Sequence, residues 1–230
     1  MTTPSLLFLA SIALEHAYKE LMPMFERETG IRIEAEWPSS VQMLERLKGG
    51  EIVDVVGLSS GSIDALIDHG AITRGSRVDV AKSGVGVAVR QAALRPDTSS
   101  LAALKAAILA APSVGISTGP SGIYLKQLFE KEGMLAQLGE RLRIVTKGPV
   151  GALVASGEVA LGFQQMIELQ PVAGIDFWPL SDDAQKVTTF SLGVHAKAPN
   201  AQAARQWVEF VSSARAVPVL ARHGATPLRG

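Results

Sequence analysis

Cysteine is absent from the 230-residue sequence. This absence excludes disulfide bonds, catalysis by a thiolate and the common zinc sites that use thiolate ligands. It is consistent with an exported protein that avoids stray thiols, but many cytoplasmic proteins also lack cysteine. The lack of cysteine therefore limits the chemistry of the protein and leaves its compartment open.

A surplus of either charge is also absent. Lysine and arginine together number 22, aspartate and glutamate together number 22, and the formal net charge is zero. No global basic field is available to attract nucleic acid or an anionic membrane. We therefore expect no nucleic-acid partner, although a local basic pocket remains compatible with this composition.

Long apolar runs are missing as well. No run approaches the roughly 20 residues of a membrane-spanning helix. The first residues lack the basic region, the long apolar region and the small-residue cleavage site of a signal peptide, and Leu6–Ala10 is better interpreted as a first strand. Two interpretations follow: a cytoplasmic protein if the sequence is complete as written, or an exported protein whose signal has been removed.

Metal-binding and nucleophile motifs are not found in the sequence. The four histidines are scattered and lack the spacing of metal ligands. There is no His-Glu-x-x-His motif, no Gly-x-Ser-x-Gly nucleophile elbow and no phosphate-binding P-loop. We therefore expect no metal and no cofactor, and the sequence does not support a serine hydrolase.

The sequence does contain a repeated order of strand, small hydroxyl residues and helix. With 47% hydrophobic residues, the chain can build a sizeable core in one domain or in two lobes. The alternation of strands and helices predicts an α/β fold. The order occurs four times, with Ser11 after Leu6–Ala10, Ser39 and Ser40 after Ile31–Trp37, Ser59 and Ser60 after Ile52–Leu58, and Ser117–Gly122 after Val114–Ile116.

These serine-rich helix starts predict an anion site. Ligands of open α/β sheets bind beyond the carboxyl ends of the strands, and a helix N-terminus offers free N–H groups and a favourable dipole to an anion. Ser39 and Gln42 also form a capping-box pattern, so a purely structural cap is the alternative. The convergence of four such helix starts favours a ligand site over capping alone.

Three more residues lie near predicted strand ends. Tyr124 is on the first turn of its predicted helix, where it either reaches the ligand or only packs its ring. Lys147 precedes another helix start and is the expected charged ligand contact. Gln164 follows the buried strand Val159–Phe163, and its amide can bond either a carboxylate or the loop backbone.

Asp54 interrupts the apolar strand predicted over Ile52–Val56. A buried carboxylate needs partners. We therefore interpret Asp54 as a structural acid bonded to nearby backbone N–H groups rather than as a catalytic group.

Five short segments share their order and spacing with a known family. They are Ala10-Ser11, the Phe-Glu-Arg-Glu-Thr-Gly segment Phe25–Gly30, Ser39-Ser40, Val53–Val55 and Val154–Gly162. Together they span nearly the whole chain, and their arrangement resembles that of type II periplasmic binding proteins, in the branch of the molybdate-binding proteins.

The resemblance implies a two-lobed type II periplasmic-binding-protein fold. Each lobe would be a mixed, mostly parallel sheet flanked by helices, with a ligand cleft between the lobes. We expect residues 1–81 and 190–230 to form the first lobe and residues 82–189 the second, because a return strand near Phe190 lets the late helices rejoin the first lobe. The candidate ligand-binding residues are Ser11, Ser39, Ser40, Ser59, Ser60, Ser121, Gly122, Tyr124, Lys147 and Gln164.

The resemblance also implies a function. Members are monomeric periplasmic proteins that capture a small anion for an ABC transporter, whose membrane subunit would be the partner. Molybdate binders carry a tyrosine where Gln164 stands, and their second-lobe loop lacks the form Gly119–Gly122. These departures point to another oxyanion, an organic-acid carboxylate.

An enzyme is the alternative, because the same branch is similar to aconitate isomerases. The protein would then isomerise a small unsaturated carboxylic acid, and Lys147, Tyr124 and His16 would be the candidates for acid–base catalysis. The apolar stripe of its predicted helix places His16 on the outer face. We therefore expect binding ahead of catalysis.

Overall fold

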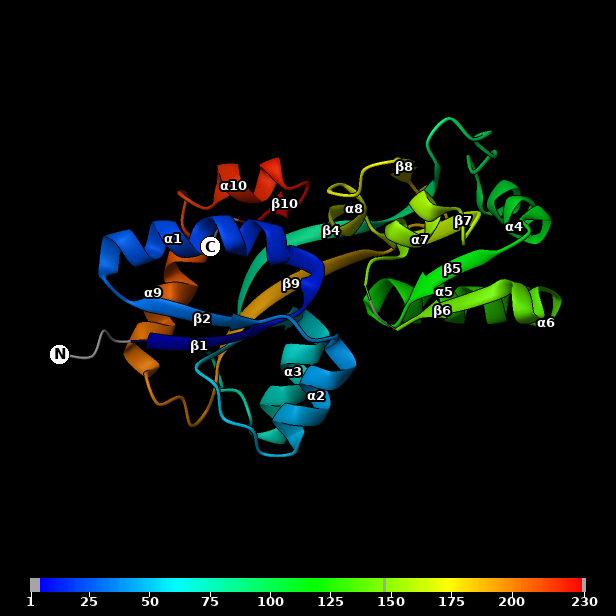
Figure 1. Cartoon of the computed structure of the whole chain (residues 1–230). Helices are drawn as coiled ribbons and strands as arrows, with labels where there is room; N and C mark the ends of the chain where they lie inside the picture. The colour runs from blue at the N-terminus through cyan, green and yellow to red at the C-terminus, as the bar shows by residue number, and fades with distance from the viewer. Residues whose placement is uncertain (1–4, 147, 229–230) are drawn as a thin grey trace. The chain divides into compact units, whose positions relative to one another are not determined.

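The computed structural model describes residues 5–146 and 148–228. The chain divides into two compact units. Unit 1 is formed by residues 1–82 and 189–230, and unit 2 by residues 83–188. Figure 1 shows that each unit contains a sheet with helices packed against it.

The sheet of unit 1 is mostly parallel at its centre. Its strands are β1 (Ser5–Ala10), β2 (Arg32–Glu36), β3 (Val55–Ser59), β4 (Val78–Arg90), β9 (Val187–Val194) and β10 (Thr226–Pro227). Their order is β2-β1-β3-β9-β4, and β10 pairs with β4. Strand β1 is parallel to both β2 and β3, whereas β9 is antiparallel to β3.

Helices cover both faces of this sheet. They are η1 (Ile12–Leu14), α1 (Glu15–Thr29), α2 (Ser40–Lys48), α3 (Ser60–His69), α9 (Ala201–Ser212) and α10 (Val217–Arg222). Helices α1 and α10 lie on one side of β1 and β2, and α2 and α3 lie on the other (Figure 1). Successive side chains of a strand point to opposite faces, so neighbouring residues of β1 join different cores.

Phe8 and Leu9 show this division. The ring of Phe8 packs edge-on against Tyr18 of α1 at 5.0 Å and against Trp207 of α9 at 5.7 Å between ring centroids. Leu9 instead belongs to the apolar cluster that α2 and α3 form with the opposite face, which includes Met43. The alternation of side chains along β1 thus determines which helices pack against each face of the sheet.

Asp54 is a structural acid, as predicted, but the predicted strand over Ile52–Val56 was placed too early. Strand β3 begins at Val55, after Asp54. The buried carboxylate accepts hydrogen bonds from the backbone N–H groups of Leu7, at 2.8 Å, and Asn200, at 2.7 Å. Asp54 therefore joins the start of β3 to β1 and to the segment before α9.

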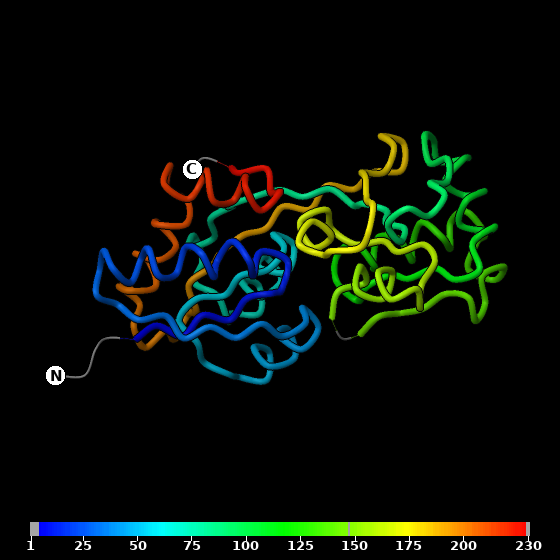
Figure 2. Tube along the Cα trace, turned by 45° about the horizontal axis from the view of Figure 1, so that its top comes forward, coloured from blue at the N-terminus to red at the C-terminus, as the bar shows by residue number. Residues whose placement is uncertain are grey.

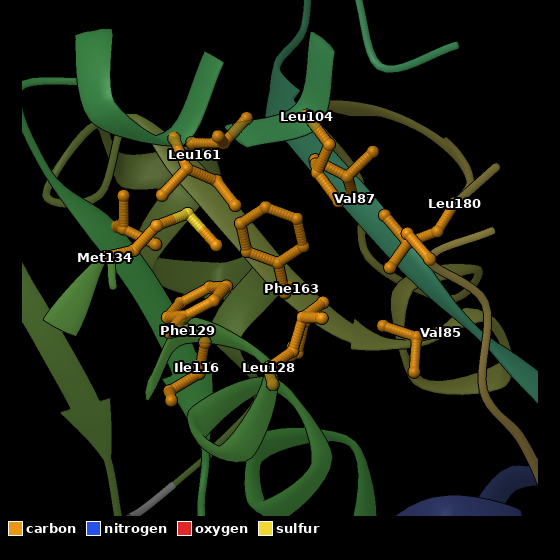
Figure 3. Close-up of a cluster of buried hydrophobic side chains, with 14 of the residues drawn as sticks. Val85, Val87, Leu104, Ile116, Leu128, Phe129, Met134, Leu161, Phe163 and Leu180 are labelled. Atoms are coloured by element: carbon orange, nitrogen blue, oxygen red, sulfur yellow. The ribbon is translucent and has the colours of Figure 1, made fainter. Parts of the chain in front are cut away.

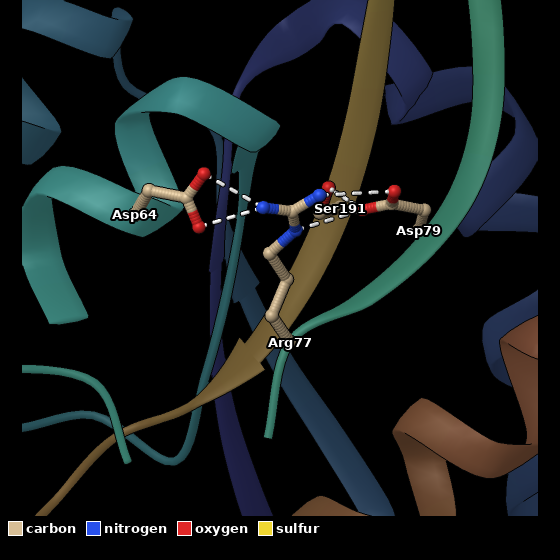
Figure 4. Close-up of polar contacts among 4 residues, drawn as sticks. All are labelled: Asp64, Arg77, Asp79 and Ser191. Carbon is tan, nitrogen blue, oxygen red and sulfur yellow. Dashed lines mark hydrogen bonds and ion pairs between the residues drawn. The ribbon is translucent and has the colours of Figure 1, made fainter. Parts of the chain in front are cut away.

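A second polar cluster of unit 1 is centred on Arg77 (Figure 4). Its guanidinium donates to both carboxylate oxygens of Asp64, at 2.6 and 2.7 Å, and to Asp79 at 2.9 Å. Asp79 also accepts from the buried hydroxyl of Ser191 at 2.6 Å. Chiefly because of the hydrogen bonds from Arg77, the pKa of Asp79 is lowered. The cluster joins α3, β4 and β9.

The strands of unit 2 form a mixed sheet. Its strands are the second part of β4, β5 (Val114–Ser117), β6 (Leu142–Val145), β7 (Leu161–Gln165) and β8 (Ile175–Pro179). The order is β4-β7-β5-β6, and β8 also pairs with β4. Strand β5 is parallel to β6 and β7, and β4 is antiparallel to β7. Its helices are α4 (Leu101–Ala110), α5 (Pro120–Lys131), α6 (Leu135–Leu138), η2 (Gly139–Arg141), α7 (Val150–Ser156) and α8 (Met166–Leu169).

The core of unit 2 also has two sides. Figure 3 shows the larger cluster, in which Val87, Ile116 and Phe163 of the sheet meet Leu104 of α4 and Phe129 of α5. A smaller cluster on the other side contains buried residues of α7, α8 and β8. These residues include Val154, Leu169 and Ile175.

The chain passes between the units twice, in β4 and in β9. Both strands contribute residues to unit 1 and to unit 2. The two strands are neighbours in the sheet, and Figure 2 shows them running side by side.

Candidate functional site

The carboxyl ends of three parallel strands meet at one edge of unit 1. In the pairing register, Leu9 of β1 faces Glu36 of β2, and Ala10 faces Gly57 of β3. Each strand is followed closely by a helix or a helical turn. The predicted serines of the first three strand–helix connections therefore lie at the same edge. They are Ser11, Ser39, Ser40, Ser59 and Ser60.

Ser11 is a nearly buried residue whose hydroxyl is not engaged by any other described residue. The residue is 8% exposed, and its backbone N–H donates to the carbonyl of Gly57 at 2.9 Å. Within residues 5–146 and 148–228, no hydrogen bond is formed by its side chain. The hydroxyl is not one of the fully buried polar atoms that lack a partner, so it remains accessible from outside. Ser11 is thus available to a ligand that reaches this edge.

Ser39 has the capping role that its pattern with Gln42 predicts. Its hydroxyl accepts from the backbone N–H of Gln42 at 3.3 Å, and the side chain of Gln42 accepts from the Ser39 N–H at 3.1 Å. This capping box begins α2 and satisfies two backbone N–H groups. Ser40 follows as the first residue of the helix, and its hydroxyl is not hydrogen-bonded to any residue in the described part of the chain. A ligand contact by Ser39 or Ser40 stays a prediction.

Ser59 and Ser60 also differ in whether their hydroxyl is engaged by another residue. The hydroxyl of Ser59 donates to the hydroxyl of Ser62 at 2.9 Å. The hydroxyl of Ser60, at the first position of α3, has no such partner among the residues that the structure describes. Of the two candidates, Ser60 therefore has the freer side chain.

Unit 2 has a comparable edge, formed by the carboxyl ends of β5, β6 and β7. Ile116 of β5 faces Phe163 of β7, and Ser117 faces Val145 of β6. Helices α5, α7 and α8 begin within a few residues of these strand ends. The edge therefore carries Ser121, Gly122, Val150 and Gln164.

Ser121 and Gly122 form a tightly packed helix start. The hydroxyls of Ser117 and Ser121 are 3.4 Å apart, and Ser121 is 1% exposed. A Cβ atom placed on Gly122 would lie 1.6 Å from the carbonyl oxygen of Ser117. Only glycine lets α5 approach the end of β5 this closely, so Gly122 has a packing role that sequence reasoning did not assign to it.

The three acid–base candidates from the sequence lie in different surroundings. The hydroxyl of Tyr124 donates to the carbonyl of Ala184 at 2.9 Å, and its pKa is raised by burial and by the charge of Asp183. His16 is exposed, and its ring stacks on that of His223 with 6.4 Å between ring centroids. Lys147 lies outside the described residues.

Gln164 is fully buried, and its amide connects two helices. Its Oε1 atom accepts from the backbone N–H of Val150, the first residue of α7, at 2.8 Å. Its Nε2 atom donates to Oε1 of Glu168 in α8 at 3.1 Å. The amide thus bonds the backbone at the first residue of α7 and the carboxyl of Glu168, and the side chain has a partner at both ends. A ligand contact by Gln164 stays a prediction.

Glu168 is the residue at this edge that sequence reasoning missed. It is partly buried, and its pKa is raised to about 7 because burial disfavours the charged form. Hydrogen bonds from Gln164 and from the backbone N–H of Gln165 oppose this shift only in part. The sequence did contain a signal for Glu168, because this acid stands between the apolar residues Ile167 and Leu169, shortly after a buried strand.

Metal chemistry has no evident site in the part of the chain that the structure covers. No three side chains of histidine, aspartate or glutamate gather there as metal ligands would. None of the helices described is long and apolar enough to cross a membrane. What the two edges can offer is hydrogen-bond donors for an anion and one carboxyl group with an unusual pKa.

Known proteins are similar to this chain over nearly its whole length. The family model for bacterial extracellular solute-binding proteins matches residues 6–226. Aconitate isomerase from Pseudomonas sp. is 34% identical over 233 residues, which cover 97% of this chain and 88% of that protein.

Solved structures of binding proteins have the same fold. The periplasmic molybdate-binding protein of Azotobacter vinelandii superposes with a TM-score of 0.79 at 19% identity, covering 96% of this chain and 98% of that chain. The binding protein AgtB from A. tumefacien R10, in complex with agropinic acid, gives a TM-score of 0.79 at 13% identity over 99% of this chain and 84% of that chain. At these identities the likeness concerns the fold, and it confirms the predicted two-lobed type II class.

Proposed function

The chain belongs to the family of bacterial extracellular solute-binding proteins, and we propose that it captures a small organic-acid anion with hydroxyl groups at the strand edges described above. The observation that carries the proposal is the hydroxyl of Ser11. Ser11 is 8% exposed at the edge where β1 ends, and its hydroxyl remains accessible and has no partner among the described residues. A ligand oxygen would supply the missing hydrogen bond.

An anion suits the surroundings of Ser11. Helices α2 and α3, of nine and ten residues, begin at the same edge of unit 1. Their first N–H groups and their dipoles favour negative charge. The hydroxyls of Ser40 and Ser60 add donors that are not used elsewhere in the described structure. In unit 2, Ser121 would supply a corresponding contact.

An organic acid is preferred over molybdate for two reasons. The sequence is 34% identical to aconitate isomerase, whereas its 19% identity to the Azotobacter vinelandii molybdate-binding protein supports the fold alone. In addition, Gln164 stands where molybdate binders carry a tyrosine, and its amide is already paired at both ends. A ligand with several carboxylates would instead use the dispersed hydroxyls.

Delivery of the ligand to an ABC transporter is part of this proposal. The family match supports a binding role. A membrane subunit as the partner, a monomeric state and a periplasmic location are further parts of the proposal. Lys147 remains our proposed charged contact to the ligand.

Isomerisation of an unsaturated tricarboxylate is the second candidate function. It is favoured by the 34% identity to aconitate isomerase over 97% of this chain. Such a reaction moves a proton at carbon, so it requires an acid–base group beside the ligand. A binding protein that only captures the anion requires none.

Thermal-shift measurements with a panel of anions test the proposal. The panel contains trans-aconitate, cis-aconitate, citrate and tricarballylate, with molybdate, tungstate, sulfate and phosphate as inorganic anions, all at one ionic strength. We expect a rise in melting temperature with one or more of the carboxylates. At 100 times the dissociation constant, ligand binding adds about 2.7 kcal/mol to the free energy of unfolding.

Two results of the panel would count against the proposal. A shift with none of the eight anions would contradict capture of a small anion. A shift with molybdate or tungstate, and with no carboxylate, would contradict the assignment to organic acids.

A further inference from the structure

Glu168 is a carboxyl group placed at the strand edge of unit 2. It is the third residue of α8, directly after β7, and β7 ends beside β5, whose connection carries Ser121. No ion pair involves Glu168 in the described structure. A carboxyl at an edge that would receive an anion calls for an explanation, because two negative charges repel each other.

The orientation of Gln164 fixes the hydrogen bond that Glu168 receives. A backbone N–H can only donate, so the atom of Gln164 that faces the N–H of Val150 must be the amide oxygen. The amide nitrogen therefore points to Glu168 and donates to its Oε1 atom. Because Gln164 is fully buried, this arrangement holds the carboxyl in one place.

Among the residues that the structure describes, no charged group pairs with Glu168. Helix α7 and strands β7 and β8 pack against α8, and β4 approaches it at Gly86. In unit 2 these elements contain two titratable side chains, Asp176 and Arg90, and both are exposed. Asp176 accepts instead from the N–H of Ala92 at 3.2 Å.

Burial raises the pKa of Glu168 to about 7. Near neutral pH the group is therefore present both as a carboxylate and as a carboxylic acid. A group in this state can accept a proton and return it, which is the property required for general acid–base catalysis.

Capping of α8 is the structural alternative. The carboxyl of Glu168 receives the N–H of Gln165, the residue before the helix, in the manner of a capping box. A cap works equally well on an exposed surface and with a glutamine in place of glutamate. Capping therefore explains the hydrogen bond. It does not explain why a partly buried position carries an ionisable side chain that also receives a hydrogen bond from the fully buried amide of Gln164.

We propose that Glu168 is the acid–base residue of this protein and that it transfers a proton between two carbons of a bound unsaturated tricarboxylate. The proposal rests on the isomerase candidate above. The carboxylate of Glu168 takes a proton from the methylene carbon of the ligand, so that a C–H bond breaks and an O–H bond forms. The electron pair spreads over the three-carbon unit and its carboxylate.

The second half of the reaction restores the enzyme. The carboxylic acid of Glu168 gives its proton to the carbon at the other end of the three-carbon unit, and the double bond comes to lie one position away. Atoms and electrons balance without an oxidant, a reductant or a cofactor. Gln164 acts as a positioning residue, because its amide holds the carboxyl of Glu168.

The test compares Glu168→Gln with the matched variant Glu158→Gln. Glu158 is an exposed carboxylate of unit 2 whose side chain bonds Ser156. Each protein is incubated with trans-aconitate in deuterated water, and proton spectra record both deuterium uptake at carbon and appearance of the cis isomer. Calorimetric titration with tricarballylate, which lacks the double bond, measures binding separately.

We expect Glu168→Gln to lower the rates of exchange and isomerisation at least about 100-fold, which is the lower range for loss of an acid–base group. Its affinity for tricarballylate should not fall, because glutamine keeps the size of the side chain and removes a negative charge. Glu158→Gln should behave as wild type. The wild-type rate should change with pH near 7, and the residual rate of Glu168→Gln should not.

Three results would overturn the assignment. If the wild type binds tricarballylate but does not exchange protons of trans-aconitate, the assignment of Glu168 is refuted and anion capture is left intact. If the wild type binds no carboxylate at all, the proposed function itself is refuted. An unchanged rate in Glu168→Gln would show that another residue moves the proton. Equal losses of affinity and rate would make Glu168 a structural residue.

A second variant covers the case in which Glu168→Gln does not fold. Glu168→Asp keeps a carboxyl on a shorter side chain and should move the pH profile and lower the rate at least about tenfold. An unchanged rate and an unchanged profile in Glu168→Asp would contradict the proposal.

Discussion

Gln164 Nε2 lies 3.1 Å from Oε1 of Glu168, and the same amide accepts the N–H of Val150 through its oxygen at 2.8 Å. One fully buried side chain thus connects the end of β7 with the starts of α7 and α8. The arrangement fixes the geometry of the edge at which we expect unit 2 to contact its ligand.

Removal of this amide should destabilise the protein. Gln164→Ala leaves the buried N–H of Val150 without a partner, and an unsatisfied buried group costs about 1–3 kcal/mol. Urea unfolding measures the loss. Gln127→Ala, on the exposed side of α5, is the matched control and should stay within about 0.5 kcal/mol of wild type. Equal stability of the two variants would show that the bridge contributes nothing.

Gly122 and Gly119 provide a second matched pair. A Cβ on Gly122 would lie 1.6 Å from the carbonyl oxygen of Ser117, so the backbone must move in Gly122→Ala. We expect a loss of at least the roughly 1–3 kcal/mol that overpacking usually costs. At Gly119, where φ is −80° and the nearest atom would be 3.7 Å away, alanine should be neutral or slightly stabilising. Thermal unfolding of both variants decides this; similar melting temperatures would contradict the packing described.

Ser11 and Ser39 should separate ligand binding from folding. Ser39→Ala removes a helix cap and should cost about 1 kcal/mol of stability. Ser11→Ala removes a hydroxyl with no partner among the described residues, so stability should hardly change. Its loss of a hydrogen bond to a charged ligand should instead weaken binding by about 1.5–3 kcal/mol. Unchanged affinity for the best carboxylate in Ser11→Ala would remove Ser11 from the binding site.

His195 should make stability depend on pH. It is buried, its Nδ1 atom accepts the N–H of Lys197 at 3.1 Å, and its pKa is lowered by burial and by the charge of Lys197. As pH falls below the usual histidine value of about 6.5, the unfolded chain takes up a proton before the folded protein does. The contribution of His195 to the free energy of unfolding is therefore lost as pH falls from about 7.5 towards the pKa of His195 in the folded protein. Below that pKa the loss no longer grows.

The measurement for His195 is the free energy of unfolding of wild type and His195→Gln between pH 7.5 and 5.5. The advantage of wild type should shrink at acid pH. His69→Gln, at the exposed end of α3, is the control for loss of an imidazole. A constant difference between wild type and His195→Gln across the range would show that His195 does not titrate in this way.

The fold was predictable because its signals are local. The four strand–serine–helix connections appear in the predicted order, since strand periodicity and helix starts depend on neighbouring residues. The structural role of Asp54 followed from its apolar surroundings. The exact start of β3 did not, because it depends on the N–H groups of Leu7 and Asn200, which lie far away in the sequence.

The candidate site was less predictable because it depends on tertiary contacts. Sequence alone treats Ser11 and Ser39 alike, yet only Ser39 is used by its own helix. The hydroxyl of Tyr124 bonds Ala184, sixty residues away. Glu168 lies in a helix of four residues, too short to show periodicity, and its pKa depends on burial that no local pattern reports.

The most direct test of the central claim is calorimetric titration of the purified wild-type protein with trans-aconitate and, separately, with molybdate. We expect the protein to bind the tricarboxylate saturably, with about one site per chain, and to bind molybdate more weakly or not at all. Saturable binding of molybdate, together with no heat from trans-aconitate, citrate or tricarballylate, would contradict it.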